Sequence, residues 1–196
     1  MGCALSELGW VWGATLGQEV AVAREPLLDL SEQEVLLLRD SWRLIQDDIS
    51  KLGVIMFVRL FETHPECKDV FFLFRDVDDL QKLRTSKELR THGLRVMSFV
   101  EKSIARIDHP ERLEQLALEL GKSHYKYNAP PKYYQYVGAE FISAVQPILK
   151  EKWTPEVENI WQHLFMYISN VMQMGYQEEE RRKAEEKHRL RGHNGI

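Results

Sequence analysis

The sequence of 196 residues predicts an all-α protein, and three observations support this fold class. Apolar residues recur every three or four positions along most of the chain, which is the period of an amphipathic helix. No stretch of useful length alternates between polar and apolar residues as a half-buried strand would. Pro65, Pro110 and the Pro130-Pro131 pair separate the periodic segments, as helix-delimiting prolines do.

The first helix is predicted to begin just after Ser31, in the segment LSEQEVLLLRDSW. Ser31 and Glu34 have the spacing of a capping box, in which each side chain binds a free backbone N–H of the first turn. One apolar face is then formed by Val35, Leu38, Trp42, Ile45 and Ile49. We therefore expect this helical face to continue as far as Ile49.

The second helix is predicted from about Val54 to His64, since Pro65 disfavours helix in the residue before it. A third helix is predicted over residues 85–107. Its apolar stripe consists of Leu89, His92, Val96, Phe99, Val100 and Ile104. This stripe places one histidine among aliphatic and aromatic side chains.

The fourth helix is predicted to begin at Asp108 or His109, with Pro110 in the first turn, where a missing N–H is tolerated. Its apolar stripe consists of Leu113, Leu116, Leu120 and His124. Two longer helices are predicted at about 133–150 and 155–174. The second histidine of interest therefore lies on a different helix from the first.

Three zones divide the chain: an extension over residues 1–28, a helical domain over 29–176 and a charged tail over 177–196. Hydrophobic residues make up 44% of the sequence, which is enough for one sizeable core. The tail has almost no apolar face. It is therefore either a solvated helix end or a disordered segment.

Composition argues against several classes of protein. The net charge of −4 gives no global basic field, so nucleic-acid binding is not expected. Cys3 and Cys67 form neither a disulfide framework nor a paired zinc motif, which favours a reducing compartment. No apolar run approaches the ~18 residues of a spanning helix. The N-terminus carries Glu7 and lacks the basic region of a secretory signal.

The candidate chemistry lies in His92 and His124, one on each apolar stripe. A buried imidazole hydrogen-bonds, binds a ligand or costs stability, and for a single histidine a hydrogen bond in the core is the usual explanation. Two on separate helices, with the phenylalanine-rich segment VFFLF between the second and third helices, can line a flat apolar slot with a nitrogen at each face. A haem requires such a slot.

These motifs together resemble the globin family from about Asp29 to Met174. The segments LSEQEVLLLRDSW, FVRLFETHPE, VFFLF, THGLRV and LELGKSHYKYNAPPKYY follow one another in the family's order. The resemblance implies a globin fold of about six to eight helices around a haem pocket, with extensions at both ends. It also implies haem b, iron protoporphyrin IX, as cofactor.

By this resemblance His124 is expected to ligate the iron on the proximal side and His92 to lie across the ring. The other implied haem contacts are Phe71, Phe74, Val96, Leu120, Phe57 and Arg95. Phe71 lies 21 residues before His92, as the family's haem-packing phenylalanine does. Arg95 either pairs with a haem propionate or is an ordinary solvated helix arginine.

The state of the sixth iron position decides the expected mechanism. The interval of 32 residues between His92 and His124 resembles neuroglobins and cytoglobins rather than muscle myoglobin. Phe57 fits the same group, so the resemblance predicts that His92 ligates the iron directly. An oxygen carrier, store or sensor with an open sixth position is the alternative.

The first residues, MGCALS, match the N-myristoylation pattern, with Gly2 as the acceptor and Ser6 at the required position. One myristoyl chain binds membranes only weakly, and a palmitoyl group on Cys3 would supply the second anchor. Acylatable residues before a globin and a charged tail after it resemble the membrane-associated globin X group. This resemblance predicts the cytoplasmic face of the plasma membrane, or the cytosol without acylation.

The resulting expectation is a haem protein that binds oxygen or other gases and performs redox chemistry at the membrane. Electron transfer with an unknown partner, reduction of nitrite and protection of lipids are the candidate roles. A dedicated enzyme is not expected, since the sequence shows no electron-donor domain. Slow nitrite reduction would not require one.

Overall fold

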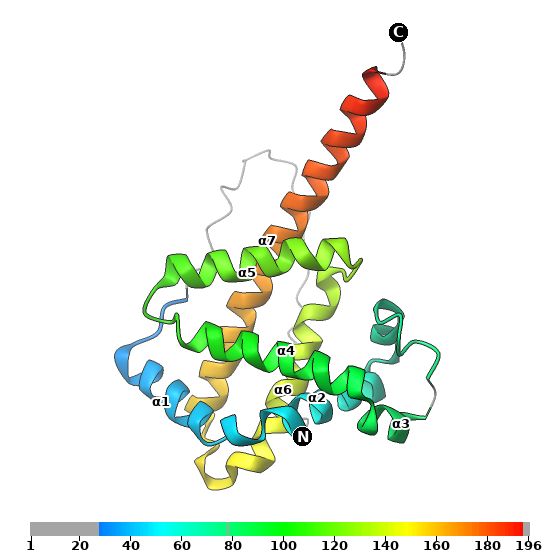
Figure 1. The fold of residues 1–196 in the computed structure, drawn as a ribbon. Coiled ribbons are helices and arrows are strands. Elements are labelled where there is room, and N and C mark those ends of the chain that lie inside the picture. The colour runs from blue at the N-terminus through cyan, green and yellow to red at the C-terminus, as the bar shows by residue number, and fades with distance from the viewer. Residues whose placement is uncertain (1–27, 78, 194–196) are drawn as a thin grey trace, which may run out of the picture.

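The computed structural model describes residues 28–77 and 79–193, and within these ranges the regular structure is entirely helical (Figure 1). The α-helices are α1 (Glu32–Arg43), α2 (Ile49–Thr63), α3 (Leu80–Thr85), α4 (Lys87–Ile104), α5 (Pro110–Lys126), α6 (Tyr134–Leu149) and α7 (Pro155–His193). Short 3₁₀ turns are η1 (Gln46–Asp48), η2 (Pro65–Val70), η3 (Pro131–Tyr133) and η4 (Lys150–Lys152). The predicted all-α class is confirmed.

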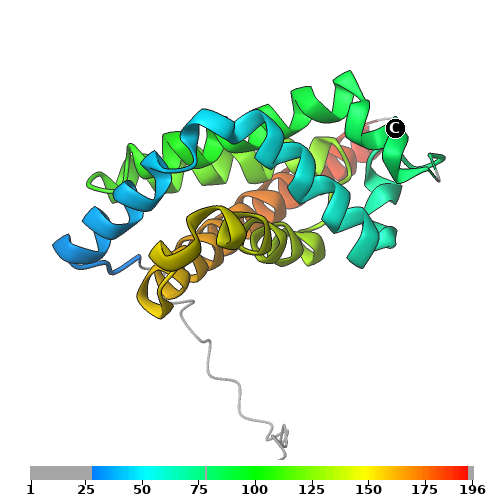
Figure 2. The same cartoon turned by 90° about the horizontal axis from the view of Figure 1, so that it is seen from below.

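The helices pack in crossing pairs around one core. Helix α2 lies against α4 and α6, while α5 lies along α7. Viewed from below, α6 and α7 lie together on one side of the molecule and α1 and α2 on the other (Figure 2). The last turns of α7 project beyond α5, and the side chains of residues 180–191 are exposed (Figure 1).

The start of the first helix was predicted correctly, but its end was not. Ser31 caps α1, and the reciprocal contact with Glu34 completes the capping box. Helix α1 ends at Arg43, whereas Ile49 begins α2, five residues before the predicted start of that helix. The polar turn η1 separates the two helices because aspartate competes for backbone hydrogen bonds and weakens a continuous helix.

Two further segments differ from the expectation. Helix α3, whose N-cap is Asp79, was not predicted because it has only six residues and thus almost no detectable period. Helix α7 continues through the charged tail to His193, so the predicted boundary at residue 176 falls inside a helix. Of the two alternatives for the tail, the structure shows the solvated helix end. Pairs such as Glu179 with Arg182, three residues apart, support it.

Trp161 on α7 forms the centre of the core and is fully buried. Its ring packs against Trp42 and Phe141, at centroid distances of 6.3 and 4.8 Å. Its indole N–H donates to the Ser41 hydroxyl, which in turn donates to the backbone oxygen of Leu38. The buried polar atoms are thus paired, so this tryptophan joins α1, α6 and α7 without a desolvation cost.

Helices α2 and α4 touch through their backbones at Gly53 and Gly93. A Cβ at Gly53 would lie 2.8 Å from the Cα of Gly93, closer than side-chain carbons approach. Gly93 directly follows His92 in the chain. The crossing therefore fixes the height at which α4 presents His92 to the interior.

A part-buried ion pair joins α2 to α6. Arg59 donates to the Glu140 carboxylate at 3.0 Å, and the Thr63 hydroxyl donates to the other oxygen at 2.8 Å. The Glu140 side chain is only 8% exposed, whereas that of Arg59 is 43% exposed. Glu140 is 81 residues from Arg59, so the pair depends on the tertiary fold.

Within the described residues, no helix combines the length and apolar character needed to cross a bilayer. Helix α7 has the length, with 39 residues, but its last third is charged.

Arg59→Met is expected to lower the free energy of unfolding by about 2 kcal/mol, because a buried carboxylate loses its cationic partner. Urea unfolding measures this change. Arg43→Met is the matched control, since Arg43 pairs with Asp40 at an exposed site and should change stability by less than about 0.5 kcal/mol. Equal losses in the two variants would contradict the role assigned to Glu140.

Candidate functional site

His92 lies on the inner face of α4 between two aromatic rings. The edges of Phe57 and Phe71 contact it at centroid distances of 4.8 and 5.1 Å, with interplanar angles of 65° and 84°. Within the described part of the chain, its ring nitrogens have no hydrogen-bond partner. Burial, with smaller effects of the nearby His124 and Arg95, lowers the pKa of His92 from 6.5 to about 4. At neutral pH the imidazole is therefore uncharged.

His124 lies in the last turn of α5, and its orientation is fixed by a hydrogen bond. Its Nδ1 lies 2.9 Å from the backbone oxygen of Leu120, one turn earlier. A carbonyl oxygen only accepts, so Nδ1 carries the proton and Nε2 keeps a free lone pair. Burial lowers the pKa of His124, which also keeps this ring neutral. Tyr134 packs against it at a centroid distance of 5.3 Å and nearly perpendicular to it.

Four phenylalanines form a continuous aromatic wall beside His92. Phe61 joins Phe57 to Phe71 at centroid distances of 6.1 and 5.3 Å, and Phe74 contacts Phe71 at 5.9 Å. The structure therefore brings the predicted Phe57 and Phe71 against His92, and the predicted Phe74 packs behind Phe71. Phe61 was missed by the sequence analysis, although its spacing of four residues from Phe57 places both on one helix face.

The remaining predicted contacts lie on α4 and α5. Val96 is half-buried, one turn after His92, and packs against the core. Leu120 is half-buried and also supplies the carbonyl that orients His124. Arg95 is exposed, and its described contribution to the site is its charge near His92. Tyr134 was not predicted, although it follows the Pro130-Pro131 break at which the chain turns back.

This arrangement fits a haem. Neutral imidazoles with an available nitrogen are the form in which histidine binds metals. The hydrogen bond from Nδ1 to a backbone carbonyl is the usual outer-shell partner of a metal-bound histidine. His124 also lowers the pKa of His92, so the two rings lie within electrostatic range. His124 and His92 would hold the iron, and Phe57, Phe71 and Phe74 would provide apolar surface against the ring.

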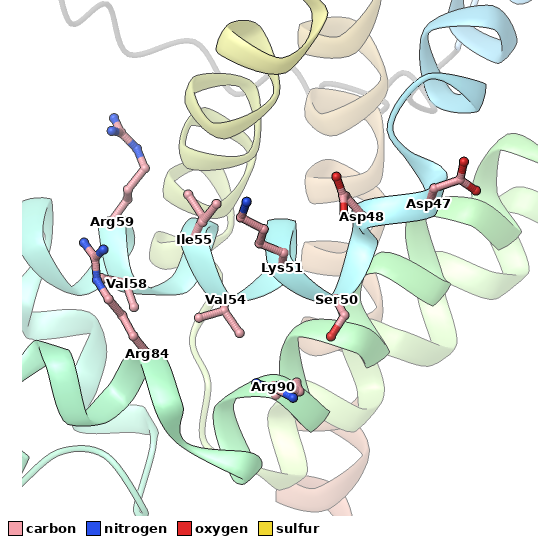
Figure 3. A pocket seen from close by; sticks show the side chains of 10 residues that line it. All are labelled: Asp47, Asp48, Ser50, Lys51, Val54, Ile55, Val58, Arg59, Arg84 and Arg90. Carbon is pink, nitrogen blue, oxygen red and sulfur yellow. The ribbon is translucent and has the colours of Figure 1, made fainter.

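A separate groove of about 590 Å³ opens on the outer side of α2, facing α3 and α4 (Figure 3). Val54, Ile55 and Val58 form its apolar part. Its four cationic side chains are Lys51, Arg59, Arg84 and Arg90, and its two acidic ones are Asp47 and Asp48. Glu140 and Glu62 already pair with Arg59 and Arg84. The groove is thus largely neutralised, and neither His92 nor His124 lines it.

Cys67, in η2, is buried and only 1% exposed. Burial raises the pKa of its thiol to about 11, so it is not a thiolate at neutral pH. The thiolate is the reactive form of cysteine, so burial disfavours reactivity here, and Cys67 packs in the hydrophobic core. Among the described residues, no cluster of three or more histidine, cysteine or acidic side chains is arranged to hold a metal ion.

The haem-free protein is expected to lose stability as the pH falls from 7 to 5. The folded-state pKa of His92 is about 4 and lies below its ordinary value of 6.5, so the unfolded chain binds a proton first and is favoured by acid. The loss attributable to His92 is about 2 kcal/mol at pH 5, at about 1.4 kcal/mol per pH unit below 6.5.

Urea unfolding of the haem-free protein at pH 7, 6 and 5 measures this slope. His92→Phe should make the slope shallower, whereas His188→Gln, which changes an exposed histidine of the α7 end, should leave it unchanged. Identical slopes in wild type and His92→Phe would show that His92 is not buried as a neutral ring.

Comparison with known proteins finds a family model and relatives that agree with one another. A family model described as Globin matches residues 55–172. Cytoglobin-2 of Danio rerio is 28% identical over 141 residues, covering 71% of this chain and 77% of the relative. Neuroglobin-1 of Oncorhynchus mykiss is 28% identical over 147 residues, covering 75% and 92%.

A solved structure shares the fold. The crystal structure of a hexacoordinated heme protein from an anhydrobiotic tardigrade, at pH 4, superposes with a TM-score of 0.71 and 19% identity, covering 76% of this chain and 96% of that one. The predicted fold and family resemblance are thereby confirmed. The chain belongs to the globin family, and this membership implies a haem cofactor and a small gaseous ligand.

Proposed function

We propose that this globin binds haem b with both His124 and His92 as axial ligands and acts in one-electron redox chemistry. The observation that carries the proposal is the state of His92: a half-buried, neutral imidazole on the inner face of α4 whose nitrogens have no hydrogen-bond partner in the described part of the chain. Such a ring keeps a nitrogen lone pair available, and a metal ion would bind it. The likeness to neuroglobins and to a hexacoordinated heme protein supports the same proposal.

Different residues hold His124 and His92 in the proposed site. On one side, the Leu120 carbonyl fixes the tautomer of His124 and leaves Nε2 as the ligand atom. On the other side, the rings of Phe57 and Phe71 pack against the His92 ring nearly at right angles. When bound, haem supplies an iron that changes oxidation state by one electron and offers a coordination position to a small gas.

A ligand set that stays the same in both oxidation states favours electron transfer. Two neutral imidazoles are such a set, because neither needs to gain or lose a proton when the iron changes charge. Electron transfer with a partner and protection of membrane lipids from oxidation are therefore the proposed roles. Slow reduction of nitrite is a further one. It would consume one electron and two protons for each nitric oxide and water formed, with electrons from an external donor.

The first test is the visible spectrum of the haem-loaded protein after anaerobic reduction. We expect sharp, separate α and β bands in the wild type and their collapse in His92→Ala, since His92 is the proposed second ligand. His163→Ala is the matched control, because His163 is exposed on α7 and should leave the bands unchanged. A single broad band in the wild type would indicate an open sixth position and favour an oxygen carrier, store or sensor.

We further propose that the protein is held at the cytoplasmic face of the plasma membrane, as a relative of the globin X group. Gly2 and Cys3 lie outside the described residues, so this proposal is supported by the sequence pattern MGCALS alone. Two acyl chains bind a bilayer far more stably than one. An anchor at this end would hold a redox protein close to membrane lipids.

Membrane fractionation of cells expressing single substitutions tests the anchor. Gly2→Ala is expected to move most of the protein to the soluble fraction, because it removes the acceptor of the first chain. Cys3→Ser should leave weak, reversible binding, since one myristoyl chain supports an association constant of only about 10⁴ M⁻¹. Ser31→Ala, which alters the cap of α1 but neither acceptor, is the control. Undiminished membrane recovery of Gly2→Ala would refute the anchor.

A further inference from the structure

Helix α5, which carries His124, packs along α7 more extensively than any other two helices in the described ranges pack together. The two backbones touch at two successive points, each marked by a glycine. A Cβ at Gly121 would lie 2.7 Å from the carbonyl carbon of Met172, and one at Gly175 would lie 2.9 Å from that of Leu118. Neither position has room for a side chain, so α5 is pressed directly onto α7.

Side chains beyond these glycines extend the contact along the end of α5. Lys122 pairs with Glu178 at 3.2 Å, and the rings of Tyr125 and Tyr176 meet edge to face at 5.2 Å. Glu179 is also buried on α7, although its residue type favours solvent. We call Met172–Glu179 the α7 clamp segment; it extends beyond residue 172, where the match to the family model ends.

Glu179 has a defined partner on its own helix. Arg182 donates two hydrogen bonds to its carboxylate, at 2.9 and 2.7 Å. The charge of Lys126, at the end of α5, also helps lower the pKa of Glu179. The clamp segment therefore remains in contact with α5 up to the turn that bears His124, and only after it does α7 become a solvated helix (Figure 1).

The contact reaches the histidine through a single peptide unit. The Leu120 carbonyl that accepts the Nδ1 hydrogen bond of His124 belongs to the peptide bond joining Leu120 to Gly121. Gly121 is the residue whose backbone rests on Met172. Any displacement of α5 from α7 at Gly121 therefore moves the oxygen that orients the imidazole.

We propose that the α7 clamp segment positions the axial ligand: by holding α5 at Gly121 and Gly175, it sets the height and tilt of His124 toward the haem iron. This inference rests on the proposed role of His124 as an iron ligand. Gly121 and Gly175 are positioning residues that act through the Leu120 carbonyl.

The test uses the full chain carrying His92→Leu, so that His124 is the one protein ligand and the reduced iron is five-coordinate. Resonance Raman spectroscopy then reads the iron–histidine stretching band, and redox titration reads the midpoint potential. Gly175→Ala and Gly121→Ala are each expected to shift both, because the added methyl group forces α5 away from α7. Haem loss should also accelerate, by roughly tenfold.

Ala144→Val is the matched control. Ala144 is buried on α6, not on α5 or α7, and its substitution by valine also adds bulk to the core. It should lower the melting temperature without moving the iron–histidine band. If both glycine variants lose stability as this control does while the band and the potential stay at their original values, the clamp is refuted.

A charge swap keeps the proposal testable if the glycine variants fail to fold. Glu178→Lys should shift the band, because it places two cations together at the end of α5, and adding Lys122→Glu should reverse part of the shift. An unmoved band in both would refute the clamp. Absence of any iron–histidine band in the His92→Leu parent would instead refute His124 as ligand, and both proposals with it.

Discussion

The direct contact of helix backbones at glycine is the constraint on which the site depends. Gly93, next to His92, rests on Gly53 of α2, and Gly121, three residues before His124, rests on α7. Each histidine is therefore tied to a neighbouring helix by backbone atoms, which cannot change rotamer. Interiors packed in this way transmit displacement instead of absorbing it. The separation of the two imidazoles is thus a property of two helix crossings more than of the histidine side chains themselves.

Burial then sets the chemistry of these two rings. Desolvation disfavours the charged imidazolium, so the apolar surroundings that complete the core also lower the pKa of both His92 and His124. The rings of Phe57 and Phe71 pack in the core and also surround His92, which helps keep this imidazole neutral and able to bind a metal. By contrast, Cys67 is buried in its thiol form and is thereby excluded from nucleophilic chemistry. Burial thus favours the neutral, metal-binding form of His92 and His124, and it disfavours the reactive thiolate of Cys67.

The parts of the molecule that depend on local patterns were predictable from the sequence, and those that depend on helix contacts were not. The capping box at Ser31 and the start of α5 at Pro110 follow local rules and were predicted correctly. The break at Arg43, by contrast, interrupts an apolar face whose period continues to Ile49. Gly121 and Gly175 carry no periodic signal, since a glycine shows only that a side chain is absent. Their importance appears only when the partner backbone is seen.

The two histidines are held by different kinds of interaction. This difference bears on two proposed properties of the site, which are retention of the haem and binding of a gas. His124 has a directional hydrogen bond to Leu120 and sits on a helix that is fixed against α7. His92 is held by the edges of Phe57 and Phe71, which contribute attraction but no directional bond to its nitrogens. Moving His92 aside would therefore break no hydrogen bond to its ring, whereas moving His124 would break the bond to Leu120. If both rings hold the iron as proposed, His92 would be the ligand released more readily, and His124 would be the one that retains the haem.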